Sequence, residues 1–95
     1  MIESFRCKET EKIFGREYSR RLPSVIQKVA FRKLRMLHRS STVEDLRVPP
    51  GNRLEALSGN RRGQHSIRIN NAWRICFIWR DGNAHDVEIV NYHKG

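Results

Sequence analysis

Four side chains in the C-terminal third of the chain are of the types that bind anions and move protons. Arg68 and Arg74 lie on either side of a short polar segment, and Tyr92 is followed directly by His93. Arginine stays charged at any ordinary pH, and its planar donor group matches the oxygens of a phosphate. Histidine exchanges protons near neutral pH, with an unperturbed pKa of about 6.5. Together, these residues predict an anion site that contains a proton-transfer group.

The four side chains come together if residues 66–93 form three short antiparallel strands joined by tight turns. Apolar side chains recur at every second position, the period expected of a strand with one buried face. The set is Ile67, Ile69, Trp73, Ile75, Phe77, Trp79, Val87 and Ile89. Residues 81–83 (Asp-Gly-Asn) are predicted to form the second turn, because Gly and Asn adopt positive φ at little cost. The parity across this turn places Val87 and Ile89 on the face that Ile75 occupies.

The register of the first hairpin follows from the same parity. A three-residue loop, Asn70-Asn71-Ala72, places Arg68 opposite Arg74. A shift by one residue would turn both arginines into the core, so the register is expected to be fixed. Like charges directly opposite each other destabilise a sheet, so the pair indicates an anion-binding surface. Tyr92 falls on this arginine face, and His93 lies at the end of its strand.

The composition indicates one small and strongly basic domain. The chain has 95 residues, with 19 Lys and Arg against 10 Asp and Glu and a formal net charge of +9. A single domain over residues 1–95 is expected to bury about 60–70% of the surface of its unfolded chain. The charge favours a polyanion or an acidic protein as partner and says nothing about the fold.

Several absences in the sequence favour a cytoplasmic protein without metal. No secretory signal peptide and no apolar run of membrane-spanning length are found. Cys7 and Cys76 are expected to be reduced thiols, as in cytosolic proteins, with a disulfide between them as the alternative. The four histidines lack metal-ligand spacing with cysteines or carboxylates, so no metal site is predicted.

The N-terminal half is predicted to supply helices that cover the sheet. Residues 1–5 are interpreted as a short strand and residues 10–16 as a short helix. The strongest helical pattern covers residues 23–38, with Pro23 in the first turn. Its apolar side chains recur at helical spacing and are Ile26, Ala30, Leu34 and Leu37. The fold class is therefore α+β, with N-terminal helices packed on a small antiparallel β-sheet.

The other face of the 23–38 helix is basic. It carries Lys28, Arg32, Lys33, Arg35 and Arg39, and residues 18–39 contain no acidic side chain. One interpretation is a solvated face of an amphipathic helix. The other is a docking surface for RNA phosphates or for an acidic partner.

The connection between the helix and the sheet contains caps and helix breakers. Ser41 and Glu44 have the spacing of a capping box, which predicts one further helical turn. Residues 48–52 contain two prolines and a Gly-Asn pair, so they end the helix and turn the chain. Residues 53–57 are then predicted as a strand, and residues 58–64 as a basic loop flanked by glycines.

Four segments in this order carry a resemblance to a known family. They are Pro50–Arg61, Gly63–Asn70, Trp73–Trp79 and Asp86–His93. Over almost its whole length the chain resembles the HigB toxins, the plasmid-maintenance killer proteins of the RelE superfamily. The resemblance implies a RelE-like α+β fold with helices packed on an antiparallel sheet. It also implies a ribosome-dependent mRNA endoribonuclease that inhibits translation.

The resemblance implies partners as well. These are a HigA-type helix-turn-helix antitoxin that neutralises the toxin, the ribosome with its mRNA, and operator DNA bound through the antitoxin. Neither a cofactor nor a membrane is implied. A non-catalytic basic module that binds RNA or the ribosome is the alternative that the composition leaves open, and its binding would depend steeply on salt.

The functional residues of the family carry over to part of the predicted site. Arg74, Tyr92 and His93 match the family motif, and Arg68 joins them as a candidate catalytic residue. RNA cleavage by its own 2′-OH requires proton transfer, for which His93 is suited, and positive charge near the phosphate, which arginines supply. Tyr92 would orient the phosphate or stack on a base.

The chain departs from the family at three positions. Ser58 and Asn70 stand where some relatives have basic residues, and Asn91 stands where aspartate is usual. Arg68, or one of the two arginines of the 58–64 loop, is the candidate for supplying the missing charge. The side chains expected to bind RNA are Arg53, Arg61, Arg62, Asn70 and Asn71.

Each candidate also has a purely structural interpretation. Arg74 would form a surface ion pair with Glu88, worth about 0–1 kcal/mol. Tyr92 would cap the sheet, and His93 would be a frayed terminal residue. The two tryptophans share the parity of the apolar set and are predicted to pack in the core.

Overall fold

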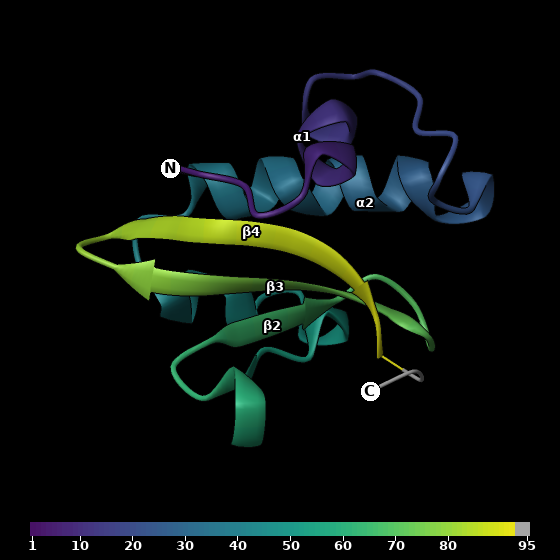
Figure 1. The fold of residues 1–95 in the computed structure, drawn as a ribbon. Coiled ribbons are helices and arrows are strands. Elements are labelled where there is room, and N and C mark those ends of the chain that lie inside the picture. Colours follow the sequence, from purple (N-terminus) through teal and green to yellow (C-terminus); the bar gives the residue numbers. More distant parts are fainter. Residues whose placement is uncertain (93–95) are drawn as a thin grey trace.

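The computed structural model describes residues 1–92 as two helices on one side of a four-stranded antiparallel sheet (Figure 1). The helices are α1 (Lys8–Phe14) and α2 (Ser24–Arg39), and the strands, adjacent in chain order, are β1 (Glu55–Ala56), β2 (His65–Arg68), β3 (Trp73–Arg80) and β4 (Asn83–Asn91). Short 3₁₀ turns at Val43–Arg47, Pro50–Asn52 and Gly59–Arg61 connect them. The predicted α+β class is confirmed. None of the helices formed by residues 1–92 is long and apolar enough to cross a membrane.

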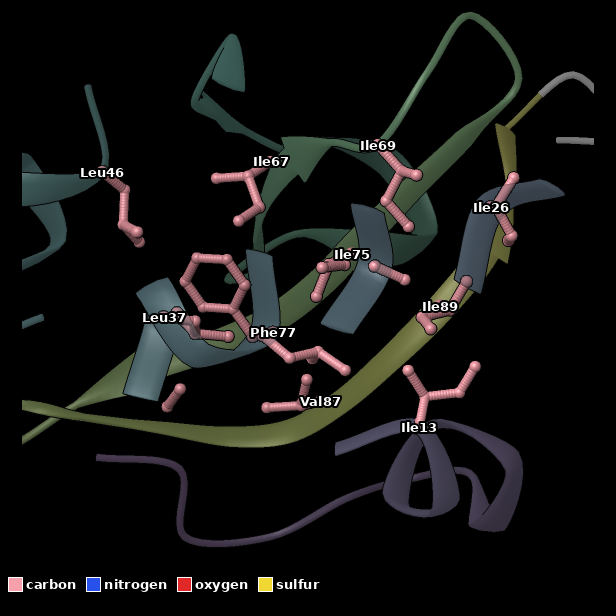
Figure 2. Close-up of a cluster of buried hydrophobic side chains, with 13 residues drawn as sticks. Ile13, Ile26, Leu37, Leu46, Ile67, Ile69, Ile75, Phe77, Val87 and Ile89 are labelled. Carbon is pink, nitrogen blue, oxygen red and sulfur yellow. The ribbon is translucent and has the colours of Figure 1, made fainter. Parts of the chain in front are cut away.

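The core lies between α2 and the sheet (Figure 2). The predicted apolar face of α2, Ile26, Ala30, Leu34 and Leu37, is fully buried. It packs with the inward side chains of the strands, among them Ile67, Ile75, Phe77 and Val87, and with Ile13 of α1. Trp73 and Trp79 are half-buried and pack against this cluster, as predicted. The two cysteines are free thiols, as predicted, and burial raises the pKa of Cys76.

The predicted register of the first hairpin is confirmed. Arg68 pairs with Arg74, and the backbone N–H of Ile69 donates to the carbonyl of Trp73 at 2.8 Å. Asn70 fixes the loop, because its Oδ1 accepts hydrogen bonds from the backbone N–H groups of residues 72 and 73 at 2.8 and 2.9 Å. The two arginines therefore project from the same face of the sheet.

The second turn is shorter than predicted. Arg80 pairs with Asn83, so the loop consists of Asp81 and Gly82 alone, and β4 already begins at Asn83. Both loop residues have positive φ, 53° and 77°, which a two-residue hairpin loop requires for its twist to match that of the strands. An even-numbered loop reverses the predicted parity of the residues that follow.

A bulge in β4 restores that parity. Ile78 pairs with His85, whereas Cys76 pairs with Glu88, so β4 contains one more residue than β3 between these pairs. The backbone of Asp86, inside this interval, is left-handed with φ 51°. The apolar side chains of β4 beyond the bulge are buried as predicted. The prediction was correct for them although the turn it assumed was wrong.

The N-terminal segment covers the outer edge of β4. Residues predicted as a strand form two isolated parallel bridges, Ile2 with Ala84 and Phe5 with Val87. The backbone N–H of Glu3 donates to the carbonyl of Ala84 at 2.8 Å. The segment therefore pairs groups that an open edge would expose.

The connection from α2 to the sheet differs from the prediction in its details. The capping box consists of Thr42 and Asp45, one residue later than Ser41 and Glu44. The carboxylate of Asp45 accepts the backbone N–H groups of residues 41 and 42 at 2.8 and 3.1 Å. The predicted strand over residues 53–57 is reduced to the two residues of β1, because Arg53 is left-handed with φ 45°.

Lys33 does not lie on the basic face of α2, where it was predicted. Its side chain is buried and donates to Oδ1 of Asn52, which is also fully buried. The amide of Asn52 donates in turn to the carbonyls of Leu46 and Val48 at 3.0 and 3.4 Å. Burial lowers the pKa of Lys33. This network fixes the backbone directly before Arg53.

Candidate functional site

A depression of about 270 Å³ lies at the end of the sheet where β2 and β4 end and β3 begins. We call it the arginine depression. Its lining residues are Arg53, Arg68, Asn70, Asn71, Arg74 and Tyr92, all of which the sequence predicted for the site. None of the residues 1–92 lining it is acidic. Its chemistry is therefore suited to an anion.

Arg74 is the most buried member of the arginine depression, with 8% of its surface exposed. Its Nε donates to Oγ of Ser66 at 2.7 Å, and its Nη2 donates to the carbonyl of Arg53 at 2.5 Å. The carboxylate of Glu55 lies 3.5 Å from Nη2, so the alternative pairing with Glu88 is wrong. Because these contacts fix the guanidinium plane, Arg74 is oriented before any ligand arrives.

Tyr92 covers the guanidinium of Arg74. The Arg74 Cζ atom lies 5.4 Å from the centroid of the tyrosine ring, within the range of a cation–π contact. The backbone N–H of Tyr92 donates to the carbonyl of Ala72 at 2.6 Å, which ties the residue after β4 to the first hairpin loop. The ring is still 40% exposed, so it is held in place and remains accessible.

The arginine opposite Arg74 is held by the hairpin loop. Arg68 is half-buried, and its Nη2 donates to Oδ1 of Asn71. Two cations directly opposite each other on neighbouring strands repel each other. Here the amide of Asn71 accepts a hydrogen bond from Arg68, and the hydroxyl of Ser66 accepts one from Arg74. Glu55 is the single carboxylate that pairs with Arg74 among residues 1–92, and its side chain is half exposed. A bound anion would further reduce this repulsion.

Two predicted site residues that the structure describes, Arg61 and Arg62, do not line the arginine depression. Arg61 donates from Nη1 to Glu88 at 2.9 Å and to Gln64 at 3.1 Å, and the Glu88 carboxylate raises the pKa of Arg61. Arg62 is exposed on the loop after this ion pair. His93 lies outside the residues that the structure describes.

Sequence reasoning missed two residues that hold the site together, Ser66 and Glu55. A signal existed for Ser66, because it is two positions from Arg68 and so shares its face of the strand. No local signal identified Glu55, because its place beside Arg74 depends on how β1 pairs with β2. Within residues 1–92, no group of three His, Cys, Asp or Glu side chains is arranged to hold a metal ion.

A second basic surface lies along α2, which packs against the opposite side of the sheet from Arg74. It is a groove of about 420 Å³ lined by Arg16, Lys28, Phe31, Arg32, Arg35 and Arg39, and we call it the α2 groove. Arg16 lies 4.8 Å over the ring of Phe31, and Arg35 lies 5.6 Å over that of Phe14. Aromatic rings therefore hold two of its five cations in place.

Comparison with known proteins identifies the family. A family model described as the RelE-like toxin HigB of type II toxin-antitoxin systems matches residues 3–93. Toxin HigB-1 of Vibrio cholerae serotype O1 is 44% identical over 85 residues, covering 88% of this chain and 90% of that protein. An uncharacterized protein of Haemophilus influenzae is 34% identical over 74 residues, covering 78% of this chain and 72% of its own.

Solved structures agree on the fold. A point mutant of YafQ from E. coli matches with a TM-score of 0.66 and 10% identity, covering 99% of this chain and 97% of that one. YafQ from E. coli strain BL21(DE3) matches with a TM-score of 0.61 and 9% identity, at the same coverage. At such low identity these matches show a common fold alone. From the family model and the Vibrio relative, the chain belongs to the HigB family of RelE-like toxins of type II toxin-antitoxin systems.

Proposed function

We propose that this toxin is an endoribonuclease that cleaves mRNA on the ribosome, with the scissile phosphate bound in the arginine depression. The observation that carries the proposal is the convergence of Arg53, Arg68 and Arg74 with Tyr92 on one depression. The orientation of Arg74 by Ser66 adds support, because fixed donors stabilise developing charge without reorganising during the reaction. Membership of the HigB family is consistent with this activity.

The chemistry requires no nucleophile from the protein. The 2′-OH of the RNA attacks the adjacent phosphorus while the bond to the 5′-oxygen breaks. The 2′-OH proton passes to a base, and the leaving 5′-oxygen takes a proton from an acid. The products are a 2′,3′-cyclic phosphate and a free 5′-OH. The enzyme contributes proton transfer and positive charge near the non-bridging oxygens.

Roles follow from the positions of the side chains. Arg53 and Arg68 bind the non-bridging oxygens. Arg74 supports the same charge with Nη1, which none of its contacts with residues 1–92 uses, and it positions the ring of Tyr92. His93 is assigned the proton transfer on the sequence alone, because it directly follows Tyr92 and a histidine side chain can both donate and accept a proton. The scheme has no step that needs a metal ion.

We assign the two basic surfaces of the protein to two different RNAs, and an antitoxin is a further partner. A toxin of a type II system has an antitoxin as its partner, and we assign that role to a HigA-type helix-turn-helix protein through which the complex binds operator DNA. The α2 groove is proposed to dock on ribosomal RNA. The residues 1–92 that line it include five cations and no carboxylate, which favours a polyanion. Docking there would leave the arginine depression, on the other side of the sheet, open to mRNA.

The ends of the cleaved RNA test the proposed reaction. Ribosomes programmed with a short mRNA are incubated with the toxin, and the fragments are analysed by mass spectrometry. A free 5′-OH and a cyclic or 3′-phosphate are expected, and a 5′-phosphate would refute attack by the 2′-OH. The rate should also be unchanged by EDTA under conditions in which the ribosomes stay intact. Loss of cleavage from intact ribosomes would refute metal independence.

Single substitutions distinguish catalysis from mere binding. His93→Gln should slow single-turnover cleavage by about 10²–10⁴-fold, because glutamine cannot exchange protons, while ribosome binding persists. Arg68→Ala should slow it by about 10²–10³-fold. Arg80→Ala is the matched control, since Arg80 is an exposed arginine of β3 outside both basic surfaces. Equal, small losses in all three variants would refute the roles of His93 and Arg68, and ribosome binding without any cleavage by the wild type would favour the non-catalytic binding module.

A further inference from the structure

Arg53 contributes to the arginine depression in two ways. Its side chain lines the depression, and its carbonyl accepts a hydrogen bond from Nη2 of Arg74 at 2.5 Å. Both contributions depend on the backbone of Arg53, because its φ and ψ set the directions of the carbonyl and of the side chain. The placement of two of the arginines that line the depression therefore depends on the conformation of one residue.

The backbone of Arg53 has a conformation that its own side chain disfavours. Its φ of 45° and ψ of 56° lie in the left-handed region, where the Cβ atom of any residue other than glycine is crowded. A residue persists in this region only where the surrounding structure fixes it there. The neighbours of Arg53 must therefore impose the conformation that directs its carbonyl and its side chain.

The side chain of Asn52 supplies a restraint directly before Arg53. It is fully buried, and its Nδ2 donates to the carbonyls of Leu46 and Val48 at 3.0 and 3.4 Å. Its Oδ1 accepts a hydrogen bond from the buried ammonium of Lys33 on α2. The amide of Asn52 thus attaches the chain before Arg53 both to α2 and to the segment that follows this helix.

Backbone hydrogen bonds complete the restraint on both sides of Arg53. Its own N–H donates to the carbonyl of Pro50 at 3.1 Å, which closes the 3₁₀ turn before it. After Arg53, the pairing of Glu55 with Ser66 starts the ladder between β1 and β2. Within the 3₁₀ turn Asn52 is the buried residue. Its amide is therefore the side-chain contact by which the turn is attached to the helical layer.

We propose that Asn52 is a positioning residue of the cleavage site, which acts on the phosphate through Arg53 and Arg74. The inference rests on the proposed function for the identity of the reaction. Asn52 is fully buried and is not among the residues 1–92 that line the arginine depression, so it does not contact the RNA itself. Without its amide, Arg53 relaxes toward an extended backbone, its carbonyl turns away, and Nη2 of Arg74 loses the acceptor that fixes it.

Two variants without the amide separate positioning from stability. Asn52→Ala leaves the buried ammonium of Lys33 without its acceptor, whereas Asn52→Ala combined with Lys33→Met also removes that charge and should be more stable. Single-turnover cleavage of ribosome-bound mRNA should nevertheless fall by about 10–100-fold in both, because both misplace the two arginines. The ribosome concentration that gives half the maximal rate should change by less than about twofold, because Asn52 lines neither basic surface.

Leu37→Ala is the matched control, because Leu37 is a fully buried side chain of α2 that lines neither basic surface. It should lose stability through the cavity it leaves, yet cleave at the wild-type rate when folded. A second measurement follows Arg74 in the isolated, full-length toxin. In the wild type, the hydrogen bond from Nη2 to Arg53 slows rotation of the guanidinium, so its two Nη groups should give separate nitrogen NMR signals. These signals, assigned by their loss in Arg74→Lys, should merge in both Asn52 variants and stay separate in Leu37→Ala.

The outcomes separate this proposal from the proposed function. Wild-type cleavage by the double variant, or equal slowing in Leu37→Ala, would mean that stability alone explains the loss and would overturn the positioning role. Separate Arg74 signals in the Asn52 variants would overturn it as well, whatever the cleavage rates. If Asn52→Ala does not fold, the double variant and Leu37→Ala decide the question. A wild-type toxin that leaves ribosome-bound mRNA intact would refute the nuclease, while merged signals in the variants would still support the positioning of both arginines by Asn52.

Discussion

The guanidinium of Arg74 lies against the ring of Tyr92, with Cζ 5.4 Å from the ring centroid. Arg74 is itself fixed by Ser66 and by the carbonyl of Arg53, while Tyr92 is fixed through its backbone to Ala72. The cation and the aromatic ring of the site are therefore positioned by each other and by three separate segments. A change at either residue should affect phosphate binding and the placement of the ring together.

Replacing Arg74 by lysine tests this coupling. Arg74→Lys keeps the charge, but an ammonium cannot donate to Ser66 and Arg53 while it also covers Tyr92. We expect cleavage of ribosome-bound mRNA to fall by about tenfold to a hundredfold, a loss of about 1.4–2.8 kcal/mol in transition-state binding. Arg80→Lys makes the same change at an exposed position of β3 and should retain full activity. Wild-type activity in Arg74→Lys would remove this residue from the site.

The alanine variant at the same position should also be less stable. Arg74→Ala removes the N–H groups that donate to the buried hydroxyl of Ser66 and to the carbonyl of Arg53. We expect the free energy of unfolding to fall by about 1–3 kcal/mol in urea titrations. If cells that express this variant no longer stop growing, the measured stability shows whether the variant is still folded. An unchanged midpoint would contradict the buried network.

Charge reversal in the α2 groove should weaken ribosome binding. The double variant Arg32→Glu and Arg35→Glu places two carboxylates among the remaining cations, so phosphate contacts are lost and repulsion is added. The dissociation constant should rise by more than about tenfold at low salt, and its dependence on salt should become less steep. Arg20→Glu with Arg80→Glu changes the net charge equally at exposed positions outside the groove.

Equal weakening in the two double variants would show that net charge alone drives association.

Hydrogen exchange of the toxin in complex with its antitoxin tests whether the antitoxin covers α2. Protection of α2 by the antitoxin would mean that an acidic protein segment covers the groove in the inactive complex. Protection confined to other surfaces would exclude α2 as the antitoxin interface.

A double-mutant cycle measures how much the buried contact between Lys33 and Asn52 contributes to stability. Asn52→Ala leaves a buried ammonium and the carbonyls of Leu46 and Val48 without their partner. It should cost about 2–4 kcal/mol in urea unfolding. Adding Lys33→Met removes the buried charge, so the double variant should be more stable than Asn52→Ala alone. Simple additivity of two losses would contradict the pairing.

His38 should make the stability of the protein sensitive to mild acid. Its Nδ1 accepts the backbone N–H of Ile2 at 3.1 Å, which requires the unprotonated form. Burial lowers the pKa of His38 from its ordinary value of 6.5, with the charged N-terminus and Arg35 adding to the effect. As pH falls, the unfolded chain therefore binds a proton at a higher pH than the folded protein does. The contribution of neutral His38 to stability is present above pH 6.5 and is lost as pH falls through the lowered pKa.

Urea titrations between about pH 5 and pH 7.5, a window that brackets the titration of histidine, measure this loss. His38→Asn is the control, because Oδ1 of asparagine can accept the same hydrogen bond without titrating. Its stability should fall less than that of the wild type over this interval. Parallel curves for the two proteins would show that other groups cause the acid sensitivity.

The sequence by itself determined the features that depend on local periodicity. Alternation along residues 66–80 and an odd loop placed Arg68 opposite Arg74, because a slip of one residue would bury both charges. Helical spacing identified the buried face of α2, because its apolar side chains recur on one side of the helix. Strand parity and the family resemblance together named the six lining residues of the arginine depression before any contact was known.

The tertiary structure decided everything that depends on partners distant in the sequence. The pairing of β1 with β2 places Glu55 beside Arg74. The loop after β1 places Arg61 in an ion pair with Glu88. Helical spacing placed Lys33 among the exposed cations, but its side chain is buried, where it donates a hydrogen bond to Asn52.

The bulge at Asp86 shows why such features escape a periodic pattern. Two errors of one residue, in the turn and in the strand, cancelled, so the inward side chains of β4 were predicted correctly from a wrong turn. Side-chain periodicity constrains which residues are buried. The free energy of packing and pairing across the whole sheet decides where the chain inserts a residue to achieve that burial, and no local window of sequence contains that information.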